Sequence, residues 1–267
     1  MLGLHAGGSD LHSHILLVPF ISAYLVFIQR DRLPRNYSSS SGAAGFFFVI
    51  GLVALVAGWL ARRSDHPLSH NDDLALTIFS FIALLMAAGF AFLGRHWMKS
   101  TAFPFFFLLF MIPLPDQAVD WLETASKLAS AEAAHLFFSV SGIPYMRDKL
   151  LFYLPNIVLE VAQECSGIRS SFVLFITSLL AAHLFLTQPW RRALLVAVVI
   201  PLGILRNGFR ILVIGLLCVE VGPHMIHSVV HRRGGPLFFA LSLIPLFLLL
   251  WWLRKGEAKQ GAAGNAA

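Results

Sequence analysis

A cysteine lies where a polar segment meets the start of a long apolar stretch. Cys165 belongs to the sequence ECSGIRSS at residues 164–171, and a hydrophobic run of helical length follows it. Unpaired backbone amides at a helix N-terminus stabilise a thiolate, and Arg169, one turn further on, adds positive charge. The neighbours Ser166 and Gly167 are not typical of a packed core. Most free cysteines are packing residues, yet this setting favours interpreting Cys165 as a nucleophile.

Polar residues also interrupt the apolar run at residues 193–221, where Arg206, Asn207 and Arg210 occur. A charged side chain at the centre of a bilayer costs at least about 2.5–3.5 kcal/mol on insertion scales, so such residues usually have a function. Counted from the start of the run, Arg210 lies about 26 Å along a helix, near the far side of a core about 30 Å thick. We interpret the arginines Arg206 and Arg210 as candidates for an anion stabiliser, with Asn207 in a supporting role. The alternatives are snorkelling arginines or a break between two short helices.

A histidine before the last apolar run supplies a candidate base. His231 opens the sequence HRRGGP at residues 231–236, and its side chain would take a proton from the thiol and later give one to a leaving amine. His224 and His227 are rivals on spacing. His227 and His231 would also suit a metal if they lay on one helix, but no acidic residue nearby completes such a site. We therefore expect no metal or other cofactor.

The composition predicts the elements that must position these residues. The chain has 57% hydrophobic and 13% charged residues, whereas soluble domains have about 25% charged residues. This predicts an all-α polytopic membrane protein, and the net charge of +6 then reflects topology rather than binding to nucleic acid. The N-terminus lacks the basic region of a cleaved signal peptide. The second cysteine, Cys218, lies in an apolar stretch and is interpreted as packing.

Seven membrane spans are predicted, with a single integral membrane domain over residues 1–267. Lys and Arg are more frequent on one side of this arrangement, which places the N-terminus outside and the C-terminus inside. The domain divides into N-terminal helices at 1–114, an outer segment at 115–164, catalytic helices at 165–253 and a cytoplasmic tail at 254–267. The predicted spans are Leu11–Ile28, Ala43–Ala61, Leu74–Gly94, Thr101–Leu114, Gly167–Leu186, Ala193–Val221 and Leu237–Leu253.

The longest segment outside these spans precedes Cys165. Residues 117–140 have helical periodicity and predict a helix at the outer interface or packed on the bundle. Residues 150–154 and 157–161 predict two strands on either side of the turn pair Pro155-Asn156. This hairpin would deliver Cys165 to the outer surface of the membrane.

Three separated motifs resemble those of the exosortases, polytopic membrane cysteine transpeptidases related to the archaeosortases. They are ECSGIRS at 164–170, NGFRI at 207–211 and HRRGGPLFF at 231–239, which includes Gly235. The resemblance covers roughly residues 142–252 and implies that Cys165 is the nucleophile, Arg210 the anion-stabilising arginine and His231 the base. The family is usually drawn with about eight spans, one more than the seven predicted here.

The resemblance also implies a substrate and a location. Exosortases are thought to cleave membrane proteins with a C-terminal sorting signal made of a Pro-Glu-Pro motif, a transmembrane helix and a basic tail. The site would face the outside of a bacterial inner membrane, with a link to extracellular polysaccharide or surface-protein sorting. The residues leave two alternatives open: a transporter with an anion path, or a non-catalytic subunit of a polysaccharide export assembly. A transporter would not need Cys165.

Overall fold

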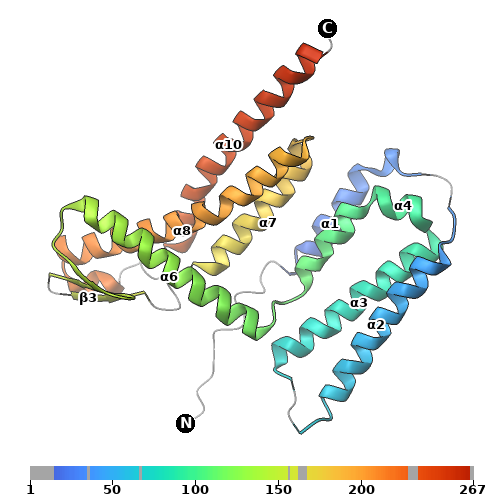
Figure 1. Cartoon of the computed structure of the whole chain (residues 1–267), viewed down its shortest axis with the longest axis horizontal. Coiled ribbons are helices and arrows are strands. Elements are labelled where there is room, and N and C mark those ends of the chain that lie inside the picture. Colours follow the sequence, from blue (N-terminus) through green and yellow to red (C-terminus); the bar gives the residue numbers. More distant parts are fainter. Residues whose placement is uncertain are drawn as a thin grey trace. The chain divides into compact units, whose positions relative to one another are not determined.

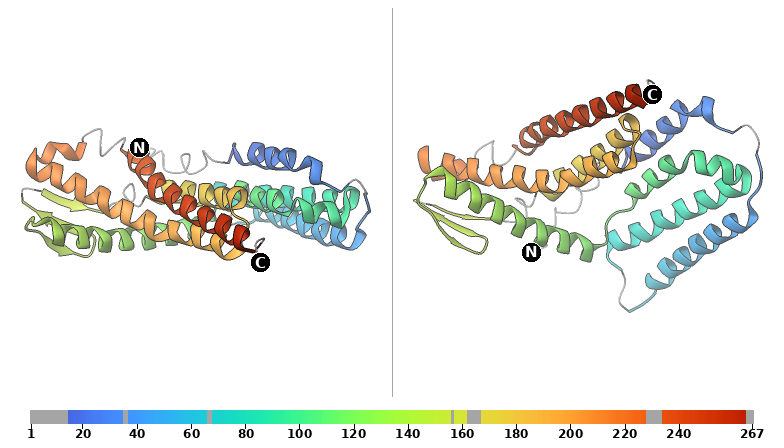
Figure 2. Two further views of the ribbon diagram at one scale, coloured as in Figure 1. Left: turned by 90° about the horizontal axis from the view of Figure 1, so that it is seen from above. Right: turned by 45° about the horizontal axis from the view of Figure 1, so that its top comes forward.

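The computed structural model describes residues 15–34, 37–65, 68–155, 157–161, 167–227 and 234–264 (Figures 1 and 2). The chain separates into two compact units, Met1–Val119 and Asp120–Ala267, and each is described by itself below. The described part of both units is mainly helical, which confirms the predicted all-α polytopic membrane fold. The division into one domain with four segments stays a prediction.

Unit 1 is built from helices that run back and forth. Two of them, α2 and α3, are long and apolar enough to cross a membrane. The remaining helices are shorter, because glycine, proline and charged residues divide this part of the chain more often. In chain order the elements are α1 (Val18–Ile28), η1 (Arg30–Arg32), α2 (Ser41–Ala61), α3 (His70–Phe92), α4 (Gly94–Ser100), α5 (Ala102–Phe107), η2 (Leu108–Met111) and the first turn of α6 (Asp116–Ser141).

The helices α2 and α3 pack closely along their length. A Cβ atom placed on Gly51 of α2 would lie 3.2 Å from the carbonyl oxygen of Ser80 on α3, so glycine permits the approach. Near one end of the pair, the rings of Phe47 and Phe90 stack with their centroids 5.4 Å apart. Small residues and stacked rings replace the hydrophobic driving force that lipid does not supply between helices.

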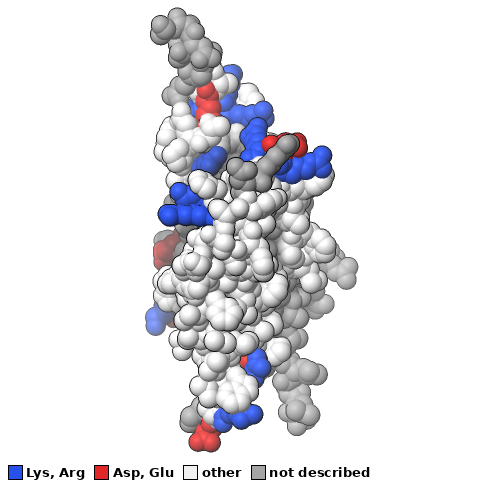
Figure 3. Space-filling model, turned by 90° about the vertical axis from the view of Figure 1, so that its right-hand side faces the viewer, with Lys and Arg blue, Asp and Glu red and all other residues white. Residues whose placement is uncertain are grey.

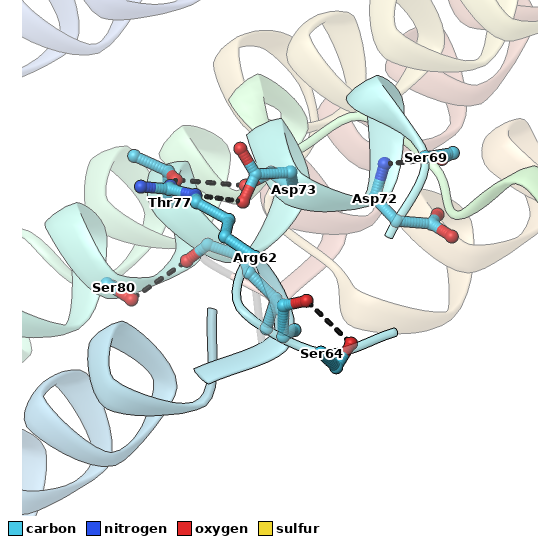
Figure 4. A network of polar contacts seen from close by, with 9 residues as sticks. Arg62, Ser64, Ser69, Asp72, Asp73, Thr77 and Ser80 are labelled. Carbon is cyan, nitrogen blue, oxygen red and sulfur yellow. Dashed lines mark hydrogen bonds and ion pairs between the residues drawn. The ribbon is translucent and has the colours of Figure 1, made fainter. Parts of the chain in front are cut away.

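Polar contacts order the turn between α2 and α3 (Figure 4). The Ser69 hydroxyl accepts a hydrogen bond from the Asp72 amide at 3.1 Å and so caps α3. Arg62, just after α2, donates from Nε to the Asp73 carboxylate at 2.7 Å and from Nη2 to the Thr77 hydroxyl at 3.1 Å. These bonds fix the turn at which the chain reverses direction between α2 and α3.

Charged residues of unit 1 gather at the two ends of the helices. The broad middle of the face in Figure 3 is free of charged side chains, as a membrane-facing surface requires. The segment before α2 meets the end of α3, where the Ser40 amide donates to the Phe90 carbonyl at 3.0 Å. This end carries Arg30, Asp31, Arg32, Arg95 and Lys99, and the opposite end carries Arg62, Arg63, Asp65, Asp72, Asp73 and Asp116.

The described part of unit 2 combines four α-helices and one short 3₁₀ helix with a small sheet. The antiparallel strands follow the order β1-β2-β3, with Phe152 opposite Arg147 on one side and Leu159 on the other. The pairing of β2 with β3 confirms the predicted hairpin, and β1 adds a strand that was not predicted. The elements are α6, β1 (Met146–Asp148), β2 (Leu151–Leu154), β3 (Ile157–Glu160), α7 (Ile168–Phe185), α8 (Pro189–Glu220), η4 (Pro223–His227) and α10 (Gly235–Gly264).

The sheet, α6 and the end of α8 share a buried core. Phe138 of α6 and Phe152 of β2 are fully buried, with ring centroids 5.3 Å apart. Cys218 of α8 is buried in the same cluster, which confirms its interpretation as a packing residue. Arg147 of β1 binds both carboxylate oxygens of Glu132 on α6, at 3.0 and 2.6 Å. This hydrogen-bonded pair raises the pKa of Arg147 and holds the edge strand on α6.

At the other end of unit 2, polar groups join α10 to the start of α8. Buried Arg191 donates from Nη1 to the Leu253 carbonyl at 2.7 Å. The Glu257 carboxylate accepts hydrogen bonds from the backbone amides of Thr187 and Gln188, the residues that precede α8. An acid at a helix N-terminus also interacts favourably with the helix dipole. These contacts hold α7, α8 and α10 together at this end.

Five helices in the described residues are long and apolar enough to span a membrane, and a broken pair, Ala102–Met111 with Asp116–Ser141, would make six. The five are α2, α3, α7, α8 and residues 235–258 of α10. Two of the seven predicted spans are shorter here: α1 has 11 residues, and Thr101–Leu114 is divided between α5 and η2. The long apolar run forms one continuous helix, α8, of 32 residues. Its arginines therefore do not mark a break.

A glycine at the crossing of α6 and α8 provides a test of this packing. A Cβ atom on Gly208 would lie 2.5 Å from the Ala133 Cβ and 2.9 Å from the Ala134 nitrogen. We expect Gly208→Ala to destabilise the folded protein by about 1–3 kcal/mol through overpacking, visible as a lower melting temperature in detergent.

The matched control is Gly45→Ala on α2, where no atom lies within 4 Å of the added Cβ. Alanine there should leave the melting temperature unchanged or raise it, because alanine favours helix by about 0.5–1 kcal/mol over glycine. Equal melting temperatures for the two variants would contradict the close crossing of α6 and α8.

Candidate functional site

The described residues include part of each predicted motif. Gly167, Arg169, Arg206, Asn207, Arg210 and Gly235 are among them. Cys165, Ser166 and His231 lie outside the described residues. The roles of all these residues stay predictions, and the geometry below comes from the described neighbours.

The helix α7 begins directly after Gly167, close to the position predicted from the sequence. Gly167 precedes α7 with φ at +66°, in the left-handed region that favours glycine. Its carbonyl accepts the Ser171 amide at 3.0 Å and the Ser170 hydroxyl at 3.0 Å, which closes the first turn of α7. Arg169 lies in this turn with an exposed side chain. The start of α7 thus presents backbone amides near the cysteine segment, with a cation beside them.

Arg206 joins α8 to the start of α7. Its Nη2 donates to the Gly167 carbonyl at 3.2 Å and to the Ser171 hydroxyl at 3.1 Å. The residue is only 8% exposed. Its Nη1 is also buried and has no hydrogen-bond partner among the described residues. The residue directly before the second motif therefore contacts Gly167 of the first motif through a buried guanidinium.

Asn207 extends this contact to α6. Its side-chain amide donates to the Ser130 hydroxyl at 2.8 Å, and both residues are buried. On the other side of the amide group, a Cβ atom at Gly167 would lie 2.9 Å from the Asn207 Oδ1. A side chain at 167 would therefore meet both a strained backbone and an occupied space. Asn207 fixes the spacing of α6, α7 and α8 at one level of the bundle.

Small residues allow the three helices to come this close. A Cβ atom on Gly203 of α8 would lie 2.7 Å from the Ser171 hydroxyl of α7. Gly208 makes the corresponding approach to Ala133 of α6. Because Gly203 and Gly208 flank Arg206 and Asn207, the polar pair is held between two tight helix crossings.

The third motif reaches the second through aromatic rings. Phe209 of α8 and Phe238 of α10 lie edge to face, with ring centroids 6.3 Å apart. Phe209 also contacts Phe137 of α6 at 6.1 Å. The described residues of all three motifs are thus joined by contacts that run from α7 to α8 to α10. The predicted convergence of Cys165 and His231 stays a prediction, because both residues lie outside the described part of the chain.

Arg210 lies one helical turn beyond Arg206 and is half-buried. Residues four apart share a face of an α-helix, so both guanidinium groups belong to one side of α8. The bundle therefore holds two arginines and an asparagine on a helix that is long and apolar enough to span a membrane. Such an arrangement can bind an anion or stabilise developing negative charge.

Two partners in this network were missed from the sequence. Ser130 lies among alanines in α6, and Ser171 belongs to the polar segment that follows Cys165. Their signal is faint, because serine is common in helices that pack closely in membranes. Only the positions of α6 and α7 against α8 reveal that Ser130 bonds to Asn207 and Ser171 to Arg206.

The fold and site define a polytopic membrane protein with a buried polar centre between its helices. The chain matches the family model described as transmembrane exosortase over residues 6–248, nearly its whole length, and belongs to that family. The exosortases are a family of membrane cysteine transpeptidases, which supports that general role for this chain. No curated protein and no solved structure gives a significant match to it.

Proposed function

We propose that the protein is a cysteine transpeptidase that cleaves a C-terminal sorting signal from membrane proteins at the outer face of the inner membrane. The signal would consist of a Pro-Glu-Pro motif, a transmembrane helix and a basic tail. The observation that carries the proposal is the bond from buried Arg206 to the Gly167 carbonyl, which joins the segment after Cys165 to the polar residues of α8. Membership of the exosortase family supports the same reaction class.

The proposed chemistry assigns one step to each motif. His231 takes the proton from the Cys165 thiol, and the sulfur attacks the scissile carbonyl carbon. Arg210 stabilises the oxyanion of the tetrahedral intermediate. When this intermediate collapses, the amine of the signal segment leaves with the proton from His231, and a thioester remains. An acceptor nucleophile or water then attacks the thioester carbonyl and releases Cys165.

The charges of unit 2 support an outward-facing site. Arg191, Arg192, Arg254 and Lys255 lie at the end where α8 begins and α10 completes its apolar part. Arg206 follows Pro189 by seventeen positions along α8, a rise of about 26 Å. Because cytoplasmic ends of membrane helices are rich in Lys and Arg, this favours a site near the opposite, outer face.

Co-production with a tagged substrate tests the proposed function. The reporter carries the complete C-terminal signal, and we expect a shorter product that lacks it. A reporter without the Pro-Glu-Pro motif should remain uncut. If the complete reporter were also uncut in membranes that contain the folded protein, cleavage of this signal class would be excluded.

The dependence on pH tests the assignment of the base. We expect His231→Ala to lose processing at neutral pH and to recover part of it under alkaline conditions. An unassisted thiol has a reference pKa of about 8.5, so its reactive thiolate forms without a base as the pH rises. Wild-type processing should fall on acidification, because the nucleophile becomes protonated. The measurement is the processing rate of the reporter across pH.

His227→Ala is the matched control and should retain processing at neutral pH. His227 ends the short helix η4, four residues before His231. Equal losses in the two variants, with no alkaline recovery, would show that the histidines act structurally and that another group is the base.

A further inference from the structure

Arg206 has a positive charge that its described contacts do not neutralise. Its two hydrogen-bond partners, the Gly167 carbonyl and the Ser171 hydroxyl, are uncharged oxygens. The three ion pairs found among the described residues involve other arginines. Its Nη1, buried and without a partner in the described part of the chain, retains unused N–H donors.

A buried charge of this kind is costly without an anion. Arg206 is 8% exposed, and removing a cation from water in a membrane bundle is unfavourable unless other groups compensate it. Neutral acceptors compensate only part of the cost. Arg210, one turn away, adds like charge to the same side of the helix. A bound carboxylate would satisfy the donors at Nη1 and neutralise the charge together, and guanidinium is suited to that group.

We propose that Arg206 forms a carboxylate-binding subsite for the substrate, beside the nucleophile. This inference rests on the proposed function and extends it, because it assigns a substrate-binding role to an arginine outside the proposed catalytic set. The substrate group would be an acidic side chain close to the scissile bond. One half of the guanidinium holds the start of α7, and the other half binds the carboxylate.

Chain connectivity places this subsite within reach of Cys165. The Gly167 carbonyl is 3.2 Å from the Arg206 Nη2, and Cys165 precedes Gly167 by two residues. Two peptide steps span at most about 7.6 Å between Cα atoms. A positive charge held beside the segment that carries the thiol attracts an anionic reagent toward it, because charges are weakly screened inside a membrane protein. The rate at which Cys165 reacts with an anionic reagent, compared with a neutral one, therefore reports on the subsite without any substrate.

Alkylation with iodoacetate and iodoacetamide tests the proposal. The thiolate attacks the same carbon in both reagents and expels iodide, but only iodoacetate carries a carboxylate. The chain has two cysteines, so Cys218→Ala leaves Cys165 as its one thiol. The measured quantity is the alkylation rate of Cys165 with iodoacetate divided by its rate with iodoacetamide, normalised to the same ratio for glutathione at the same pH. We expect this ratio to fall about fivefold or more in Arg206→Gln. Arg206→Lys should keep most of the ratio.

Two further variants distinguish the charge of Arg206 from its structural contacts and from positive charge elsewhere in the protein. Ser171→Ala removes one hydrogen bond of Arg206 but leaves its charge, so the rate ratio should be unchanged. Arg254→Gln removes the same charge from an exposed position of α10, and it should also leave the ratio unchanged.

A ratio that stays within about twofold in Arg206→Gln would overturn the subsite, as would an equal fall in Ser171→Ala. Neither outcome bears on the proposed function, because these rates need no catalysis. Loss of reporter cleavage on changing Cys165 is the separate test of that function.

Discussion

Replacing Cys165 by alanine should abolish cleavage of the reporter, with a loss of at least about a thousandfold in the processing rate. The expectation follows from covalent catalysis, since removing a nucleophile from a protease leaves only the small contribution of binding and oxyanion stabilisation. Cys165→Ala changes one side chain in a polar segment and should leave insertion and expression in the membrane unchanged. The measurement is the yield of shortened reporter per unit of membrane-inserted protein.

Cys218→Ala is the matched control for this change. Cys218 is buried in the core formed by α6, the sheet and α8, so its removal should have little effect on the processing rate. The vacated volume should cost a small amount of stability. Normal cleavage by Cys165→Ala would exclude a cysteine mechanism and would favour one of the non-enzymatic alternatives, a transporter or an export subunit.

Replacing Arg210 should slow processing by about a hundredfold to a thousandfold. That range corresponds to about 2.7–4 kcal/mol, the cost of losing one oxyanion donor in a protease of another fold. Arg210 lies on the same face of α8 as Arg206, which contacts the start of α7, so its position suits a reacting group near Cys165. The measurement compares single-turnover cleavage by Arg210→Ala with wild type at saturating reporter.

Arg210→Lys distinguishes a directed donor from simple charge. Lysine keeps the positive charge but lacks the planar fork of guanidinium, so this variant should also be slow. Normal turnover by Arg210→Lys would contradict the donor role and leave Arg210 as a source of charge only. Arg254→Lys, an equivalent change at an exposed position of α10, should have no effect.

Local patterns were sufficient to predict much of the fold. Periodicity over residues 117–140 predicted α6, and the turn pair after Leu154 predicted the pairing of β2 with β3. Both signals depend on residues close together in the chain. Span boundaries were harder, because hydropathy alone does not show where proline and glycine divide an apolar run. The 3₁₀ segment η2 and the continuity of α8 follow from backbone geometry and tertiary packing.

The candidate site was predictable as residue types but not as contacts. Cysteine, arginine and histidine in an apolar chain are conspicuous, whereas the hydrogen bond from Arg206 to the Gly167 carbonyl joins residues 39 apart. Asn207 was placed in a supporting role, yet its partner Ser130 lies 77 residues earlier. Such contacts depend on which helices pack together. Gly203 and Gly208 permit the close packing, but the residues they approach lie on other helices, so the contacts cannot be predicted from the residues around each glycine.

The acyl-enzyme is the most direct test of the central claim that Cys165 performs transpeptidation. Purified protein is mixed with the tagged reporter and quenched in acid, which preserves thioesters, and the mass of the chain is then measured. We predict an adduct equal to the reporter without its signal segment, located on the peptide that contains Cys165 and removed by hydroxylamine. A reaction that cleaves the reporter at full rate, with no adduct on Cys165 under single-turnover conditions, would contradict the account.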